Sequence, residues 1–106
     1  MDLIKKKCIP CEAGMPPMNK EKIEKYSKLV VDWSLKDGKL YKSFKFKDFK
    51  ETLNFVNKVG EIAEKEGHHP DIYFTWGKCT IELYTHAIKG LSENDFILAS
   101  KINKIV

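Results

Sequence analysis

The three histidines are the side chains of this chain best suited to moving protons at neutral pH. His68 and His69 are adjacent, and His86 follows 17 residues after the pair. Because the ordinary pKa of histidine lies near neutrality, one imidazole can donate a proton while another accepts one. An adjacent pair with a third histidine farther along is therefore a suitable layout for general acid–base chemistry without a metal.

Two other interpretations of these histidines stay open from the residues alone. Three imidazoles can hold a zinc ion that keeps one open coordination position, as in a metal hydrolase. The spacings His-x-His and His-x3-His are absent, however, and Glu64 and Asp95 are the carboxylates available as further ligands. In the other interpretation, His68 and His69 only end a helix and His86 lies on the surface.

Acid–base chemistry requires the histidines to meet, and the residues between them predict that they do. Residues 72–76 alternate as a strand, Gly77-Lys78 supplies a turn, and residues 79–85 read as the returning strand. Because a hairpin brings the chain back to its starting point, we expect all three imidazoles at one end of a sheet. His86 continues the polar face of the second strand.

Three helices are predicted around this hairpin. Asn19 and Asp48 are candidate N-caps, Gly67 is a candidate helix end, and Ser92 with Asp95 forms a candidate capping box. Apolar spacing predicts which positions of the helices face the core. These positions are Ile23, Tyr26, Val30 and Trp33, then Phe49, Leu53, Val56, Gly60 and Ala63, then Phe96, Ala99, Ile102 and Val106.

A second hairpin is predicted ahead of the middle helix. Asp37-Gly38 is a strong two-residue hairpin signal, and it lies between residues 33–35 and the alternating run at 40–46. The order of elements is then helix, two strands, helix, two strands, helix. This order predicts an α+β fold: a four-stranded antiparallel sheet with three helices packed on one face.

The length of 106 residues supports one domain, predicted over residues 19–106 after an N-terminal arm at 1–18. The arm contains Cys8-x-x-Cys11 and Pro16-Pro17. A redox motif of this spacing normally precedes a helix in a βαβ unit, which is missing here, so we expect no redox role. Three cysteines do not describe a disulfide framework, which favours a reducing cytoplasm.

Charge and hydropathy exclude further classes of protein. The net charge is +4, and all 19 basic residues are lysine, with no arginine. Arginine is the usual reader of phosphates and guanine edges, so we expect no sequence-specific binding of nucleic acid. No stretch of about 18 apolar residues is present, and we expect no membrane span.

An ordered set of residues identifies a resemblance. Glu64-Lys65-Glu66-Gly67-His68-His69-Pro70 is followed at fixed spacings by Trp76, His86 and Asp95. This set resembles the signature of the pterin-4a-carbinolamine dehydratases, and the likeness extends over nearly the whole chain. Residues 44–49 resemble the strand-to-helix junction of that family, and residues 8–17 are similar to an arm found in its bacterial members.

The resemblance implies an activity and a set of site residues. The implied reaction removes water from a 4a-hydroxytetrahydropterin to give quinonoid dihydropterin, with neither metal nor other cofactor. His68 and His86 are implied as the acid–base pair, with His69 positioning the pterin. The residues implied around the substrate are Glu64, Gly67, Pro70, Trp76, Tyr84, Thr85, Ala87 and Asp95.

Several of these implied roles have structural alternatives. Trp76 could instead belong to the core at a strand end, Glu64 could be a solvated carboxylate, and Asp95 could serve the capping box as well as the site. Asn94 stands where the resembled family often carries arginine, which leaves the preference for a pterin side chain open.

The resemblance also bears on partners. The resembled proteins are dimers or tetramers, so we expect a homodimer or homotetramer. Some eukaryotic members act as coactivators that stabilise the dimer of a transcription factor. A pterin-binding or dimerisation module without catalysis is therefore the alternative function.

Overall fold

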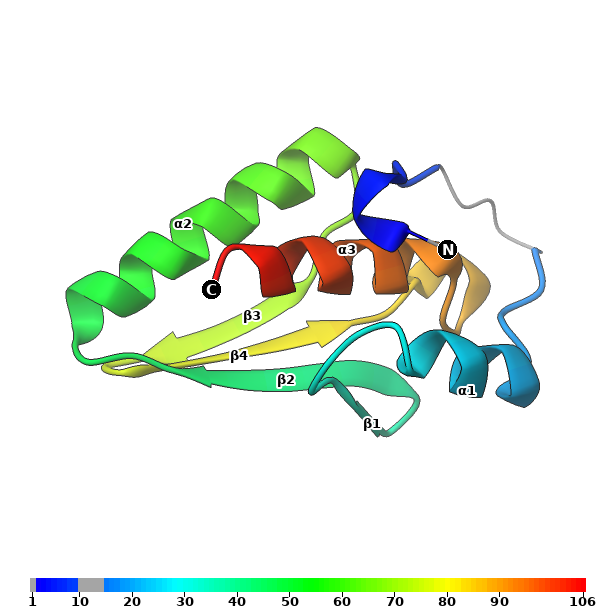
Figure 1. Ribbon diagram of the computed structural model, residues 1–106, viewed down its shortest axis with the longest axis horizontal. Coiled ribbons are helices and arrows are strands. Elements are labelled where there is room, and N and C mark those ends of the chain that lie inside the picture. Colours follow the sequence, from blue (N-terminus) through cyan, green and yellow to red (C-terminus); the bar gives the residue numbers. More distant parts are fainter. Residues whose placement is uncertain (1, 10–14) are drawn as a thin grey trace.

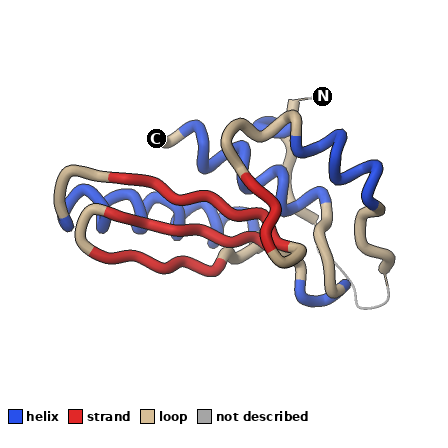
Figure 2. The backbone as a smooth tube through the Cα atoms, turned by 90° about the horizontal axis from the view of Figure 1, so that it is seen from below, coloured by secondary structure: helices blue, strands red, loops and turns tan. Residues whose placement is uncertain are grey.

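A twisted antiparallel sheet is the platform of the molecule, whose computed structural model describes residues 2–9 and 15–106. The strands are β1 (Ser34–Lys36), β2 (Lys39–Lys45), β3 (Asp71–Thr75) and β4 (Lys78–Leu83). They lie in the order β1-β2-β4-β3, and every neighbouring pair is antiparallel (Figure 2). The predicted α+β class and sheet are therefore confirmed.

Helices cover one face of this sheet. The helices are α1 (Lys20–Ser27), α2 (Phe49–Glu66) and α3 (Glu93–Lys104). Figure 1 shows α2 and α3 lying across the sheet, while α1 lies toward one end of it, near β1. Two short 3-10 helices, η1 (Leu3–Lys5) and η2 (His86–Ile88), complete the set.

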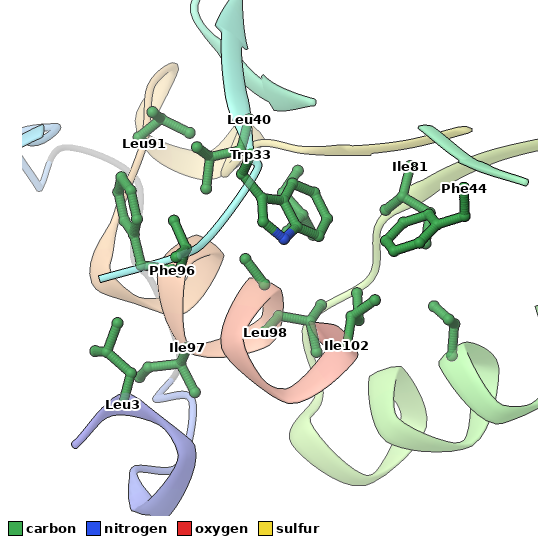
Figure 3. Packing of buried hydrophobic residues seen from close by; sticks show 14 of the residues in the cluster. Leu3, Trp33, Leu40, Phe44, Ile81, Leu91, Phe96, Ile97, Leu98 and Ile102 are labelled. Carbon is green, nitrogen blue, oxygen red and sulfur yellow. The ribbon is translucent and has the colours of Figure 1, made fainter. Parts of the chain in front are cut away.

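The buried face of the sheet follows the two-residue period of its strands. Leu40 and Phe44 of β2 and Ile81 and Leu83 of β4 point toward the helices and are at most 5% exposed. Figure 3 shows several of these side chains packed around Leu98 and Ile102 of α3. On the opposite face the side chains are more polar, and Ser43 and Thr80 share a hydrogen bond of 2.8 Å between their hydroxyl oxygens.

The predicted turn and the ends of the middle helix are confirmed. Asp37 and Gly38 both adopt positive φ, 52° and 77°, as a two-residue hairpin turn of the favoured type requires. Asp48 caps α2 by accepting the N–H of Glu51 at 2.8 Å. Gly67 ends α2 at φ 66°, a left-handed conformation that glycine adopts without steric cost.

The buried face of α2 differs from the predicted one. Phe49 and Leu53 are 46% and 38% exposed, while Thr52 and Phe55 are buried in their place. The hydroxyl of Thr52 donates to the carbonyl of Asp48 at 2.8 Å, so this side chain can enter the core with its polar atom satisfied. A count of apolar residues alone misses such a position.

The bounds of the first helix and one further core position, Val106, are also corrected, while Val30 and Trp33 are buried as predicted. The first helix ends at Ser27, so Val30 and Trp33 are buried from the segment that follows it. That segment leaves helical geometry at Asp32, which has φ 66°. Val106 lies beyond the end of α3 and is 69% exposed.

The N-terminal residues pack more closely than a free arm would. Leu3 in η1 is 3% exposed and belongs to the core beside α3 (Figure 3). The ammonium of Lys101 in α3 donates to the carbonyl of Ile4 at 2.7 Å. The division into an arm at 1–18 and a domain at 19–106 remains a prediction.

A polar network joins this segment to α1 and α3. The hydroxyl of Tyr26 donates to Glu93 at 2.7 Å, and the ammonium of Lys6 donates to the same carboxylate at 3.2 Å. The bond to Glu93, with burial and the charge of Glu93 as smaller causes, raises the pKa of Tyr26 to about 12. The same bond holds the pKa of Glu93 below its usual range, although desolvation opposes it.

Replacing Tyr26 by phenylalanine is expected to lower the free energy of unfolding by about 1 kcal/mol at pH 7. A hydrogen bond to a charged group is worth about 1.5–3 kcal/mol, and the partial exposure of Glu93 reduces that value. Because the pKa of Tyr26 is raised on folding, its hydrogen bond to Glu93 contributes fully to stability below pH 10. This contribution is lost as the pH rises toward 12. The lowered pKa of Glu93 makes it fade again as acid protonates the carboxylate.

Urea unfolding at pH 5, 7, 9 and 11.5 measures this contribution. Tyr73→Phe is the matched control, because its side chain is 59% exposed at the edge of the sheet. The difference between wild type and Tyr26→Phe should shrink at pH 11.5. A difference that does not change with pH, or a Tyr26→Phe variant as stable as wild type, would contradict the proposed network.

Among the described residues, no helix combines the length and the apolar character that crossing a bilayer requires.

Candidate active site

A pocket of about 260 Å³ opens at the end of the sheet where β3 begins and β4 ends. Four segments line it: Gly67, His68 and His69 after α2, residues 84–87 after β4, Ile9 in the N-terminal segment, and Asn94 in α3. Asp71 pairs with Glu82, so the chain leaving β4 returns beside the histidine pair. The structure thus places all three imidazoles around one pocket, which we call the histidine pocket.

His68 is held by a buried carboxylate. Its Nε2 lies 2.6 Å from Oδ1 of Asp95, and the two side chains are 11% and 0% exposed. Because an ionised carboxylate can only accept hydrogen bonds, Nε2 must carry the proton of the neutral imidazole. The other ring nitrogen, Nδ1, is then left able to accept a proton.

Asp95 is itself fixed by two further donors. Its Oδ2 accepts the hydroxyl of Thr85 at 2.8 Å and the backbone N–H of Ser92 at 3.0 Å. The bond from Ser92 belongs to the predicted capping box at the start of α3, which is confirmed. One carboxylate therefore starts a helix and orients His68 at the same time.

The other two histidines are more open to solvent. His69 Nε2 lies 2.5 Å from Glu64 Oε2, and both side chains are well exposed, at 60% and 79%. An exposed pair of this kind adds little to stability. His86 is exposed in η2, and its ring meets that of Tyr84 edge to face, with centroids 5.0 Å apart.

The structure brings most of the predicted site residues together. Glu64 and Asp95 do not line the histidine pocket but each holds a histidine that does. Pro70 leads into β3 without lining the pocket. Trp76 is 66% exposed at the β3–β4 turn, at the opposite end of these strands, so it is outside the pocket of its own chain. The pocket residues are Gly67, His68, His69, Tyr84, Thr85, His86 and Ala87, joined by Ile9 and Asn94.

Sequence reasoning missed Ile9 as a pocket residue. It lies in a segment without periodicity, and its contact with Asn94 joins residues 85 positions apart. In the sequence, Asn94 stood out only because the resembled family often has an arginine at that position. No local pattern could have paired the two.

Within the ranges 2–9 and 15–106, no group of three or more His, Cys, Asp or Glu side chains is gathered closely enough to hold a metal ion. Cys8 contacts the carbonyl of Asn94, with Sγ 3.7 Å from the oxygen, and Cys11 lies outside the described residues. Cys79 is fully buried, and burial raises the pKa of its thiol to about 11, which makes it a poor nucleophile.

The fold and the pocket together define a small α+β protein with histidines gathered at one end of an antiparallel sheet. The family model described as "Pterin 4 alpha carbinolamine dehydratase" matches residues 16–105. The chain therefore belongs to the pterin 4 alpha carbinolamine dehydratase family, which confirms the resemblance seen in the sequence.

Relatives and a solved structure agree with this assignment. A protein of Alkaliphilus metalliredigens is 50% identical over 97% of this chain and 95% of its own length. One of Rickettsia canadensis is 51% identical over 94% of each chain. Both carry the name "Putative pterin-4-alpha-carbinolamine dehydratase". A crystal structure from Brucella melitensis, named "transcriptional coactivator/pterin dehydratase", superposes with a TM-score of 0.80 at 28% identity, over 84% of this chain and 97% of the other.

Proposed function

We propose that this chain catalyses the loss of water from a 4a-hydroxytetrahydropterin, giving quinonoid dihydropterin, by general acid–base catalysis with histidines. The observation that carries the proposal is the gathering of His68, His69 and His86 around one pocket, with His68 held by the buried Asp95. Membership of the family supports a pterin as the substrate.

The reaction asks for one acid and one base. The bond between ring carbon 4a and the hydroxyl oxygen breaks, while the lone pair of the neighbouring ring nitrogen forms a carbon–nitrogen double bond. An acid gives a proton to the departing hydroxyl, which leaves as water, and a base takes the proton from the ring nitrogen. Electrons and atoms balance without an oxidant or a reductant.

The contacts of the histidines suggest how they divide these roles. His68 donates from Nε2 to Asp95, which leaves Nδ1 as an acceptor and suits this imidazole to act as the base. His86 is exposed and can regain a proton from water after each turnover, which suits it to act as the acid. His69, paired with Glu64 at the rim, is assigned to positioning the ring.

Stopped-flow measurement of 4a-hydroxytetrahydropterin dehydration tests the proposal directly. The substrate is generated enzymatically, and its decay is compared with and without the purified full chain at the same pH and buffer concentration. Acceleration that survives preincubation with a chelator is the expected result. Decay at the buffer rate would refute the dehydratase function, and loss of activity with chelator would favour the zinc interpretation.

The alternative function is a non-catalytic pterin-binding or coactivator-type module of the same fold. The name of the Brucella melitensis structure, which joins the words coactivator and pterin dehydratase, favours keeping this alternative. The same assay separates the two functions, because a binding module would bind pterin without accelerating its dehydration.

We also propose that the chain forms a homodimer or homotetramer. Apolar side chains are exposed along the edge strand β3 and the adjacent face of α2, among them Tyr73, Phe74, Phe49 and Leu53. The rings of Phe49 and Phe74 lie 6.0 Å apart, so these two side chains form one apolar patch between α2 and β3. Light scattering on the purified chain measures the assembly, and Phe74→Lys should shift it toward the monomer.

A further inference from the structure

Asn94 in the first turn of α3 holds the backbone of the N-terminal segment at Ile9. The N–H of Ile9 donates to Oδ1 of Asn94 at 3.0 Å, and Nδ2 of Asn94 donates to the carbonyl of Ile9 at 2.6 Å. Asn94 is only 4% exposed. A carboxamide offers a donor and an acceptor side by side, which neither aspartate nor leucine of the same shape can do. Asn94 therefore fixes the backbone of Ile9.

Further contacts anchor the N-terminal residues, two of them beside the ends of helices that flank the pocket. The N–H of Cys8 donates to Oε1 of Glu66 at 2.9 Å, at the end of α2. Farther along, the N–H of Met18 donates to the carbonyl of Leu91 at 2.9 Å, just before α3. The segment is thus fastened to the two helix ends that flank the histidine pocket.

Ile9 forms a shared wall between two cavities. Its side chain is 64% exposed and lines the histidine pocket. It also lines an adjoining cavity of about 490 Å³, whose other apolar lining includes Met15, Pro17 and Ile88. Asn94 lines both cavities as well. A ring bound against the histidines would therefore meet Ile9 on the side that leads to the second cavity.

Resting on the dehydratase function proposed above, we propose that Ile9, set in place by Asn94, determines which substituent on the pterin ring the site accepts. A short apolar substituent can pack against the isoleucine side chain. A longer chain with hydroxyl groups would have to pass that side chain, and placing hydroxyls against it without partners is unfavourable. The wall thus favours a methyl group over a dihydroxypropyl group.

Two fluorescent oxidised pterins, 6-methylpterin and biopterin, serve as probes of the wall. Equilibrium titration of the full chain with each gives a ratio of dissociation constants that does not depend on turnover. In Ile9→Ala the affinity for 6-methylpterin should fall about tenfold, the lower end for losing an apolar contact in a pocket. The affinity for biopterin should change less, so the dissociation constant for biopterin divided by that for 6-methylpterin should fall toward one. In the dehydration assay the KM should rise for the methyl substrate while kcat stays the same.

Matched variants separate this role from a general effect on folding. Ile4→Ala removes another exposed isoleucine of the same segment, outside both cavities, and should leave the ratio unchanged. Asn94→Ala releases the backbone of Ile9 and should move the ratio in the same direction as Ile9→Ala. Ile9→Ala keeps both hydrogen bonds to Asn94, so it remains informative if Asn94→Ala folds poorly.

The outcomes distinguish the wall from the function on which it rests. A ratio of dissociation constants that is the same in wild type and Ile9→Ala overturns the role of Ile9 while dehydration by wild type stands. A lower kcat with unchanged KM in Ile9→Ala overturns it as well. Discrimination that depends on Ile9 in a wild type without dehydratase activity would refute the proposed reaction and support the wall.

Discussion

Replacing His68 by alanine is expected to slow pterin dehydration by about 10²–10⁴-fold, the usual contribution of one general acid or base. The effect should appear in kcat, because the imidazole is proposed to act on a proton that moves in the transition state. His86→Ala should cause a loss of similar size. If each residue serves one of the two proton transfers, neither loss can be recovered by raising the substrate concentration.

The third histidine supplies the control for this prediction. His69 pairs with Glu64 at the exposed rim, and His69→Ala should raise KM more than it lowers kcat. Added imidazole should restore part of the activity of His68→Ala, because the small base can occupy the space that the side chain leaves. A His68→Ala variant with wild-type kcat would contradict the assignment. Equal losses in all three variants would point instead to a general disturbance of the pocket.

The second large effect is expected from Asp95→Asn. The N–H of Ser92 and the hydroxyl of Thr85 both point at one oxygen of residue 95, so an asparagine would keep its oxygen there. Its amide nitrogen would then face His68 and donate to Nε2. The imidazole proton would move to Nδ1, and that nitrogen could no longer accept a proton from the substrate. Dehydration should therefore slow by about 10²-fold or more.

The same substitution should also lower the free energy of unfolding by about 1–3 kcal/mol, because a buried hydrogen-bonded charge is replaced by an imperfect match. Asp48→Asn is the matched control: it changes an aspartate that caps a different helix, at the start of α2, far along the chain from the pocket. Asparagine is as good an N-cap as aspartate, so both stability and activity should stay close to wild type.

Nitrogen NMR of the His68 ring checks the cause directly. Wild type should show the tautomer protonated at Nε2, and Asp95→Asn the one protonated at Nδ1. An Asp95→Asn variant that loses activity with the wild-type tautomer would show that Asp95 acts only through stability. A variant with full activity would remove Asp95 from the proposed mechanism.

Local chemistry in the sequence was enough to predict much of the fold. The turn at Asp37-Gly38 and the helix boundaries at Asp48 and Gly67 depend on the conformations of a few neighbouring residues, and all are confirmed. The buried face of α2 could not be predicted this way. It depends on the rings of Phe44 and Phe46, which lie 4.7 and 5.0 Å from that of Phe55, and these contacts cross from sheet to helix.

In the candidate site, too, local geometry could be predicted from the sequence and long-range contacts could not. That a hairpin returns His86 toward His68 follows from strand geometry, so the pocket could be anticipated from the pattern of residues 72–85. The wall at Ile9 could not be anticipated, because no pattern near Ile9 in the sequence indicates its contact with Asn94. For Trp76 the spacing in the sequence was misleading. It implied a place beside the substrate, but Trp76 lies at the far end of the hairpin from the pocket.

The pair formed by Ile9 and Asn94 also constrains when the site can exist during synthesis of the chain. The residue that forms the wall is made well before its anchor, which follows 85 positions later. Because closing so long a loop must follow the formation of nearer contacts, the wall is assembled after the sheet and α2 have formed. A chain stopped before α3 could build the hairpin and both of its flanking histidine segments. It would still lack Asp95, which holds His68, and Asn94, which anchors Ile9. The pocket would therefore be incomplete.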